Sequence, residues 1–549
     1  MNTFVRVRKA GLALLLWSLF AYCWIALTSA VLSWARASVT LQYDMSVYHV
    51  VGREWLLHGV IPYRDLIDIK GPLTFLEYGL GAWITPFSLS GTAVIHSLVA
   101  GTALFFAWKS ALLYMRNPAA ITLTIALSTV IATFYGNPSE TVLAFQMAAL
   151  YLFLRQGCRG SAPPLFAYGA LTGAAIAVKY NLAAFFVPFI ALALWQQAKE
   201  SGLRQAARGL GRCMGGAACV LVPIAAYFAW QGALDDLWRY YLLAGFRYGV
   251  LPLSTAALFH PDAAFFGHFT PGYLRFDKML PPAFFIAAGF VFQLGGLFSI
   301  TFRKHTWLPC NRHAAATLWA SWGLCLYAIF RGPYAYYHYF ASFLPFAFLT
   351  LLTVAASLGR LRQAPAEAGV SATRKYALWA VPFLLAGILL NHMADLSRRQ
   401  FAALHLDDAA QIAAIHGMAS SREEDVPTLL TLHPYVAVFH RVSPRRPVNR
   451  NAFPQMTAEG RANWSSEAFS LLEQAVPRYV LAITDASGAP RQDEESEYPA
   501  VSGELLNMLD RHYRLKKIFH FEHAPAFRHV GIFERKGPRV NKLAVSPRT

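Results

Sequence analysis

The sequence predicts a polytopic α-helical membrane protein that carries a small α/β domain toward its C-terminal end. Only 14% of its 549 residues are charged and 56% are hydrophobic, whereas a soluble domain has about 25% charged residues. Apolar stretches recur along residues 1–392, and the composition turns polar after about residue 393. A simple soluble enzyme is therefore excluded, and so is a disordered chain, because 14% of the residues are aromatic.

Eleven stretches are apolar and long enough to cross a bilayer, which takes about 20 residues for a hydrocarbon core about 30 Å thick. They are 11–33, 92–113, 119–135, 140–156, 164–178, 181–196, 214–231, 280–302, 314–330, 337–357 and 376–392. Two of them, 164–178 and 181–196, are short. The sequence leaves open whether these two are separate spans or one bent element around Lys179.

The basic residues predict the orientation of the chain, because lysine and arginine in short loops are retained in the cytoplasm. With the N-terminus inside, every second loop carries a basic cluster. These clusters are Lys109 and Arg116; Arg155 and Arg159; Lys199, Arg204, Arg208 and Arg212; Arg303, Lys304 and Arg312; and Arg360, Arg362, Arg374 and Lys375. The net charge of +18 is therefore a record of membrane topology, and we expect no nucleic-acid partner.

The polar region 393–549 follows an odd number of crossings, so we expect it on the outer side, which is the periplasm of a bacterial inner membrane. Short β-type runs at 428–432, 479–483 and 530–533 alternate there with helical patterns at 465–474 and 502–513. This order predicts a small α/β domain, separate from a membrane domain over residues 1–392. No cysteine or histidine spacing typical of a metal site occurs in the chain.

The first outer loop, 43–73, is the most polar stretch near the membrane. Apolar residues recur at helical spacing over 45–58, which predicts an amphipathic helix at the membrane surface. Gly59 and Pro62 would end that helix, and Pro72 suits the first turn of a second one. The loop is therefore predicted to be two surface helices that frame a charged hairpin.

The motifs of this loop resemble those of a known family. Asp44 and Tyr48, then 59–65 (GVIPYRD) and 68–73 (DIKGPL), resemble the first outer loop of bacterial membrane glycosyltransferases of the GT-C superfamily. The nearest in pattern are the protein O-mannosyltransferase-like enzymes and the lipid A aminoarabinose transferases. Weaker similarities follow in the same order at 136–140, 173–179, 331–340, 440–450 and 477–480. One departure is Gly71-Pro72, where the family has paired prolines.

The resemblance implies a glycosyltransferase that moves a hexose or pentose from a polyprenyl-phosphate donor to a hydroxyl group. The acceptor would be a lipid, polysaccharide or protein of the cell envelope, on the outer side of the inner membrane, and the anomeric centre would be inverted. In that family an acidic residue directly after the first helix contributes to the active site, and a lysine of the following segment reaches the donor phosphate. Here these positions are Asp44 and Lys70.

The chemistry of such a transfer fits these residue types. A carboxylate can remove the acceptor proton as general base, and Asp44 is our candidate. Cations stabilise the leaving phosphate, and Lys70 is the first candidate, followed by Arg331 and Lys179. The alternatives are that Asp44 caps a helix and that Lys70 contacts lipid headgroups.

Further candidates for substrate contact are Asp65, Asp68, Glu140, Tyr336 and His338. The two aspartates can equally shape the loop by pairing with Arg53 and Arg64. Glu140 fits an ordinary helix start, and the aromatic residues fit the interfacial belt of a membrane protein.

The sequence requires no cofactor and names no metal ligand, and it leaves a divalent cation open. The outer loop has Asp65-x-x-Asp68 rather than the Asp-x-Asp of GT-C enzymes that transfer onto asparagine. The partners we expect are the lipid-linked sugar donor, the envelope acceptor and membrane lipids. A transporter or flippase for a lipid-linked glycan is the alternative function, although the ionisable residues gather near span ends rather than at mid-membrane.

Overall fold

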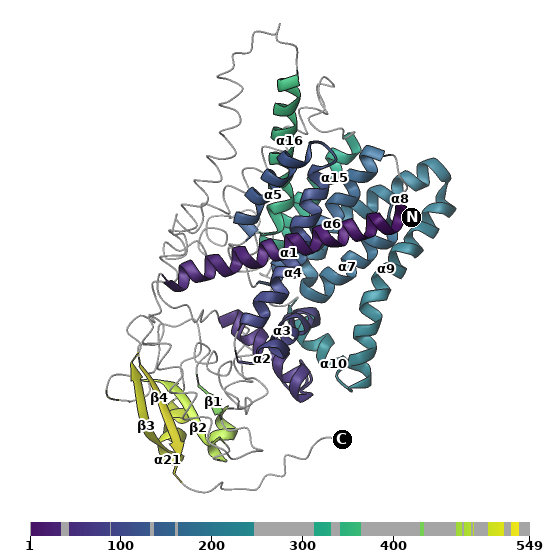
Figure 1. The fold of residues 1–549 in the computed structure, drawn as a ribbon. Coiled ribbons are helices and arrows are strands. Elements are labelled where there is room, and N and C mark those ends of the chain that lie inside the picture. Colours follow the sequence, from purple (N-terminus) through teal and green to yellow (C-terminus); the bar gives the residue numbers. More distant parts are fainter. Residues whose placement is uncertain are drawn as a thin grey trace, which may run out of the picture.

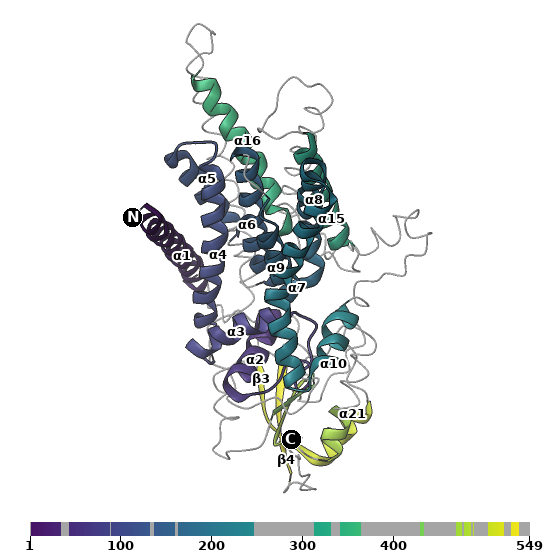
Figure 2. The same ribbon diagram turned by 90° about the vertical axis from the view of Figure 1, so that its right-hand side faces the viewer.

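The structure is a computed structural model, in which most helices form one bundle, the N-terminal helix crosses that bundle, and a small sheet lies beyond one end (Figures 1 and 2). It describes residues 2–34, 43–87, 89–131, 137–159, 163–245, 312–330, 341–363, 429–432, 468–474, 477–484, 487, 503–520 and 529–536. The two spans predicted at 280–302 and 376–392, and the boundary predicted between residues 392 and 393, lie outside these ranges.

Helices occupy the described parts of the other predicted spans. They are α1 (Asn2–Trp34), α4 (Ser90–Ala111), α5 (Asn117–Ile131), α6 (Pro138–Arg159), α7 (Leu165–Lys179), α8 (Val187–Ser201), α9 (Leu203–Trp230), α15 (Arg312–Phe330) and α16 (Leu344–Gln363). Among the described residues, three helical stretches are long and apolar enough to cross a membrane: Ser90–Ala111, Leu165–Ser201 and Leu203–Trp230. The chain is thus a helical membrane protein with a small sheet.

The stretch Leu165–Ser201 consists of two helices. The backbone of Lys179 is extended (φ −158°, ψ 94°), and a short 3₁₀ segment, η2 (Tyr180–Phe186), follows it. Leu165 at the start of α7 packs in one cluster with Ala193 in the middle of α8, so the chain reverses direction between them. Of the two interpretations that the sequence left open, the structure has the helical hairpin, with Lys179 at its turn.

Small residues allow the helices of the bundle to approach closely. A Cβ at Gly169 of α7 would overlap the carbonyl oxygen of Cys213 in α9, and a Cβ at Gly216 would overlap that of Phe166. Such contacts are typical of helix packing in a bilayer. Lipid tails are as apolar as the helix surface, so close van der Waals packing rather than the hydrophobic effect holds the helices together. The same helix faces explain why α7 and α9 lie side by side along their length.

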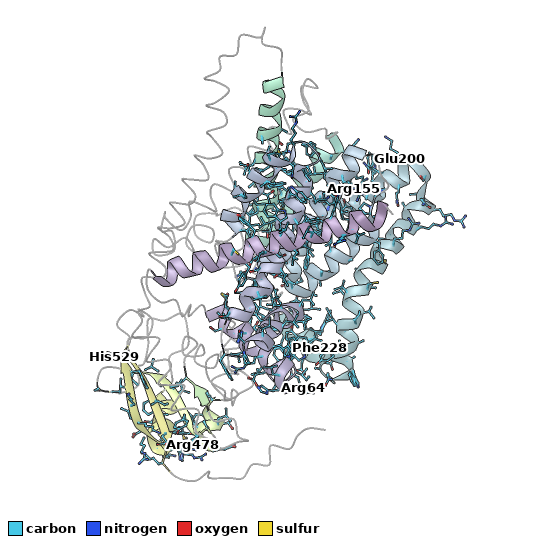
Figure 3. The ribbon with its side chains drawn as sticks, viewed as in Figure 1. Arg64, Arg155, Glu200, Phe228, Arg478 and His529 are labelled. Carbon is cyan, nitrogen blue, oxygen red and sulfur yellow. The ribbon has the colours of Figure 1, made fainter. Side chains whose placement is uncertain are left out.

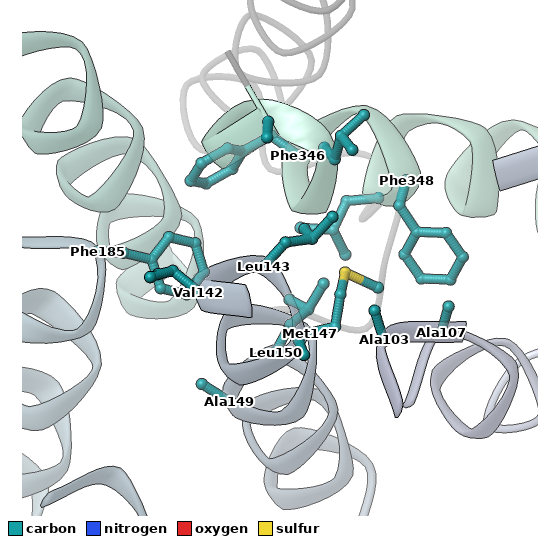
Figure 4. Packing of buried hydrophobic residues seen from close by; sticks show 14 of the residues in the cluster. Ala103, Ala107, Val142, Leu143, Met147, Ala149, Leu150, Phe185, Phe346 and Phe348 are labelled. Atoms are coloured by element: carbon teal, nitrogen blue, oxygen red, sulfur yellow. The ribbon is translucent and has the colours of Figure 1, made fainter. Parts of the chain in front are cut away.

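The main core lies between α4, α6, η2 and α16 (Figure 4). Two alanines of α4 leave room for the larger side chains of α6, and phenylalanines from η2 and α16 pack around them. The residues labelled there are Ala103, Ala107, Val142, Leu143, Met147, Ala149, Leu150, Phe185, Phe346 and Phe348. This core fixes the N-terminal end of α6 next to the hairpin turn at Lys179.

The loop that follows α1 has the two helices that the sequence predicts. They are α2 (Tyr43–His58) and α3 (Pro72–Ile84), and they pack where Gly52 faces Gly79. Gly59 after α2 has a positive φ of 69°, and Pro72 begins α3 as expected. Beyond α9 follow α10 (Leu234–Asp236) and a π-helical segment, η3 (Leu237–Leu243), which pack on the loop through an aromatic core.

The two ends of the bundle differ in the residues they carry. Figure 3 places Arg155 and Glu200 at one end, and Arg64 and Phe228 at the other, beside α2 and α3. The sequence assigned Arg155 to the cytoplasmic side and the loop with Arg64 to the outer side. The small sheet lies beyond the same end as α2 and α3 (Figures 1 and 2), so the C-terminal region and the first loop are at one end of the bundle.

The C-terminal region contains a four-stranded sheet in the order β1-β2-β4-β3. Its strands are β1 (Leu429–Thr431), β2 (Tyr479–Ile483), β3 (Tyr513–His520) and β4 (His529–Arg535), and α21 (Gly503–His512) precedes β3. β1 and β2 are parallel, and the other neighbours are antiparallel. The expectation of an α/β region is confirmed, but β3 was missed because Arg514, Lys516 and Lys517 interrupt its apolar alternation.

Candidate functional site

The polar hairpin of the first loop is fastened to the C-terminal end of α7. The N–H of Gly71 donates to the carbonyl of Val178 (3.1 Å), and the hydroxyl of Thr74 donates to the same carbonyl (3.4 Å). A Cβ at Gly71 would overlap the carbonyl oxygen of Ala177. Because only glycine permits this approach, Lys70 lies next to Lys179, although the two are far apart in sequence.

Two carboxylates and two lysines share this place. Asp44 is in the first turn of α2, and Asp68 accepts a hydrogen bond from the N–H of Lys70 (2.9 Å). Lys179 is within electrostatic range of both Lys70 and Asp44, and Asp68 is within range of the same two residues. All four side chains are half-buried, so the group lies at the surface of a recess rather than in the core.

The environment of Asp68 favours its neutral form. Burial raises the pKa of this carboxyl, and Asp44 raises it further, whereas the charge of Lys70 and the backbone N–H groups lower it. Burial is the largest of these effects and the pKa is raised overall. The site therefore gains positive charge when Asp68 takes up a proton.

Two tyrosines hold Lys70. The hydroxyl of Tyr63 donates to the carbonyl of Lys70 (2.6 Å), and the ammonium of Lys70 lies 5.6 Å from the centroid of the Tyr48 ring. Both rings are buried, and Tyr63 has a positive φ of 69°. Burial also raises the pKa of Tyr63, so its hydroxyl stays a donor. Within the described ranges no carboxylate forms an ion pair with Lys70, and its ammonium can thus meet a substrate anion.

The start of α6 reaches the site through Ser139. The ammonium of Lys179 donates to the hydroxyl of Ser139 (3.4 Å), and the side chain of Asn137 accepts from the N–H of Ser139 (3.1 Å). The segment 136–140, chosen from the sequence for its glutamate, is therefore brought to the lysines by its serine.

Glu140 itself points to a buried histidine. Nδ1 of His96 in α4 lies 3.2 Å from Oε2 of Glu140 and 3.3 Å from Oε1 of Glu77 in α3. All three side chains are more than nine-tenths buried. We call them the Glu77–His96–Glu140 cluster. Glu140 is thus next to the lysine site, with its carboxylate turned toward the helices behind it.

Asp65 shapes the loop. It accepts hydrogen bonds from the N–H of Ile61 (2.8 Å) and from Arg64, whose ion pair with it is 2.8 Å. Arg64 also donates to the carbonyl of Gln231 (2.8 Å), which ties the hairpin to the end of α9. Arg53 forms an ion pair with Glu54 (2.9 Å).

Three sequence candidates, Arg331, Tyr336 and His338, lie outside the described residues. Among the described residues, no group of three or more His, Cys, Asp or Glu side chains is arranged to hold a metal ion. Sequence reasoning missed Ser139, Glu77 and His96. For His96 a signal was present, since an ionisable residue inside an apolar span is costly and calls for a partner.

The helical bundle, with its charged first loop fastened to α7, has the same fold as a solved membrane protein. The protein compared is ArnT from Cupriavidus metallidurans bound to undecaprenyl phosphate: TM-score 0.50, 12% identity, 93% of this chain and 98% of that chain covered. The resemblance inferred from the sequence is thereby confirmed at the level of the fold.

Two more solved structures are similar to the chain. ArnT from the same organism in the apo state matches with TM-score 0.49 and 13% identity, covering 93% of this chain and 97% of that one. The oligosaccharyltransferase of Archaeoglobus fulgidus in the apo form matches with TM-score 0.46 and 14% identity, covering 85% and 69%. No protein-family model and no curated protein sequence matches the chain.

Proposed function

We propose that this protein is a membrane glycosyltransferase that transfers a sugar from a polyprenyl-phosphate donor to a hydroxyl of a cell-envelope acceptor. The transfer takes place at the outer face of the bacterial inner membrane, with a lipid, polysaccharide or protein as acceptor. The observation that carries the proposal is the convergence of Lys70 and Lys179 beside Asp44. ArnT, whose fold this chain shares, was solved bound to undecaprenyl phosphate, which supports the choice of donor.

The two lysines act on the phosphate. The donor is a phosphodiester, and negative charge develops on the leaving phosphate as its bond to the sugar breaks. Two ammonium groups fixed in a half-buried recess stabilise that charge far better than water does, because they need no reorganisation and the local dielectric is low. Lys179 is held by Ser139 and Lys70 by the two tyrosines, so both are in place before the donor binds.

Asp44 acts on the acceptor. Its carboxylate takes the proton of the acceptor hydroxyl while the oxygen attacks the anomeric carbon from the side opposite the phosphate. The bond between that carbon and the phosphate oxygen breaks, polyprenyl phosphate leaves with the electron pair, and the configuration is inverted. Asp68 does not touch the reacting atoms in this scheme. It fixes the backbone of Lys70 and adjusts the charge of the site.

Transfer from a polyprenyl-phosphate sugar, measured with the full-length protein in nanodiscs, tests the proposal. We expect Asp44→Asn to lower kcat by about 10²- to 10⁴-fold, the usual contribution of a general base. We expect Lys70→Ala and Lys179→Ala to lower kcat/KM by at least about tenfold each. Lys109→Ala is the matched control, because this lysine lies over aromatic rings in the last turn of α4, away from the loop.

Two results would contradict the proposal. Full activity in Asp44→Asn would remove the general base from the scheme. Flipping of a lipid-linked glycan in proteoliposomes, without transfer to any acceptor, would favour the transporter over the enzyme.

A further inference from the structure

The Glu77–His96–Glu140 cluster is a buried polar group that the transfer scheme does not use. It joins three helices: Glu77 belongs to α3, His96 to α4 and Glu140 to α6. The second oxygen of Glu77 accepts a hydrogen bond from the hydroxyl of Thr141 (2.7 Å), so α3 is linked to α6 directly as well as through His96. Buried charges are costly to maintain unless each one is paired, and such a group therefore strongly fixes its helices relative to one another.

One path leads from this cluster to Lys179. Glu140 follows Ser139 directly in the first turn of α6, and Ser139 accepts the hydrogen bond from the ammonium of Lys179 (3.4 Å). Any rotation or shift of this first turn moves the hydroxyl that holds the lysine. The pairing of Glu140 with His96 at 3.2 Å opposes such a shift.

A second path leads to Lys70. The ring of Tyr78 in α3 lies edge-on to His96 (5.1 Å between centroids) and edge-on to Tyr48 on its other side (5.4 Å). The ammonium of Lys70 lies over the ring of Tyr48 at 5.6 Å. The rings of Tyr78 and Tyr48 thus lie between the cluster and this lysine, and both are buried.

We infer that Glu77, His96 and Glu140 are positioning residues, which set the separation of Lys70 and Lys179 and thereby the affinity for a lipid phosphate. The inference rests on the proposed function, since it assigns the lysines to the donor phosphate. The cluster does not touch the substrate, because its side chains are buried behind Ser139 and Tyr48. It determines whether both lysines can contact the same phosphate and does not take part in the transfer of the sugar.

The test is a double-mutant cycle on the affinity for polyprenyl phosphate, measured by direct binding to the full-length protein in nanodiscs. Glu140→Gln keeps the shape of the side chain and removes its charge. We expect it to raise Kd about tenfold in the parent and less than about twofold in a Lys179→Ala background, because residues of one network are not additive. Transfer kinetics should show the same change in KM with kcat within about threefold of the parent.

Gln146→Leu is the matched control. Gln146 is also a fully buried polar side chain of α6, about two turns further along the helix, and it has no part in the cluster. We expect this variant to bind polyprenyl phosphate as the parent does. If Glu140→Gln does not fold, Thr141→Val removes only the hydrogen bond to Glu77, and a smaller rise in Kd, again absent with Lys179→Ala, is expected.

Three outcomes decide the matter. An equal rise in Kd in both backgrounds, or no rise in the parent, overturns the positioning role and leaves the cluster purely structural. A parent that binds polyprenyl phosphate without transferring sugar ends the proposed function, while the cycle still decides the role of the cluster. A parent that binds no polyprenyl phosphate overturns both.

Discussion

The contact between Gly71 and the end of α7 makes Gly71→Ala the most informative single substitution. The added Cβ would lie 2.7 Å from the carbonyl oxygen of Val178, where ordinary contact begins at 3.4 Å, and it would overlap the carbonyl of Ala177. Both neighbours are backbone atoms, which cannot rotate away as a side chain can. The hairpin must therefore move about 1 Å away from α7 to restore ordinary contact distances. A misplacement of this size is enough to impair catalysis.

The expected effect follows from what that movement breaks. The hydrogen bond from Gly71 to Val178 contributes about 0.5–1.5 kcal/mol, and forcing an extra carbon into a packed contact costs about 1–3 kcal/mol. The membrane helices do not depend on this contact, so we expect a folded protein. Lys70 is displaced relative to Lys179, and a misplacement of about 1 Å lowers catalysis by about 10²-fold.

The assay is sugar transfer by the variant in nanodiscs, together with thermal unfolding. Gly157→Ala is the control, because a Cβ at Gly157 in α6 meets no atom within 4 Å. We expect the control to transfer sugar at the parental rate. If Gly71→Ala keeps a kcat/KM within threefold of the parent, the docking of the hairpin on α7 does not create the site, and the assignment of the two lysines to one phosphate is refuted.

Three further predictions concern charge. As the pH falls through the raised pKa of Asp68, the site loses a negative charge, so KM for the phosphodiester donor should fall. The Asp68→Asn variant should have this low KM at every pH. A pH profile in Asp68→Asn that equals that of the parent would count against Asp68 as the group that adjusts the charge of the site. Arg64→Ala should change the free energy of unfolding by less than about 1 kcal/mol, because its ion pair with Asp65 is more than a third exposed; calorimetry measures this. Partial burial acts to raise the pKa of Glu534, but the hydrogen bond and charge of Lys516 lower it overall. The carboxylate therefore stabilises the sheet above the usual glutamate pKa, and this stabilisation is lost in acid. The difference in stability between the parent and Glu534→Gln, present at neutral pH, should vanish in acid, and a difference that persists in acid would exclude the ion pair as its cause.

Local patterns in the sequence were enough to predict the helices of the first loop. The apolar spacing after Tyr43, the glycine at position 59 and the proline at position 72 act over a few residues, and the structure has α2 and α3 where these signals place them. The strand Tyr513–His520 was missed because a local prediction depends on apolar alternation, and the charged residues of this strand interrupt that alternation.

Contacts between distant segments were beyond prediction from one sequence. Nothing in the spacing of Glu77, His96 and Glu140 indicates that α3, α4 and α6 bring them together. The hydrogen bond from Gly71 to Val178 is equally invisible, since it joins backbone atoms whose side chains carry no signal. The sequence named Lys70 and Lys179 separately, through a family resemblance, and their proximity is a result of the structure.

The fastening of the first loop to later helices also determines when the protein matures during synthesis. The hairpin leaves the ribosome early, but its partner on α7, Val178, follows about 100 residues later, and Tyr227, which accepts a hydrogen bond from Trp55, later still. At about 5–20 residues per second, the loop waits for about 5–20 s before α7 has been synthesised and can receive it. A nascent chain that ends before Val178 therefore has the charged hairpin without its partner on α7, and Lys70 and Lys179 come together only after the helical hairpin at Lys179 has formed.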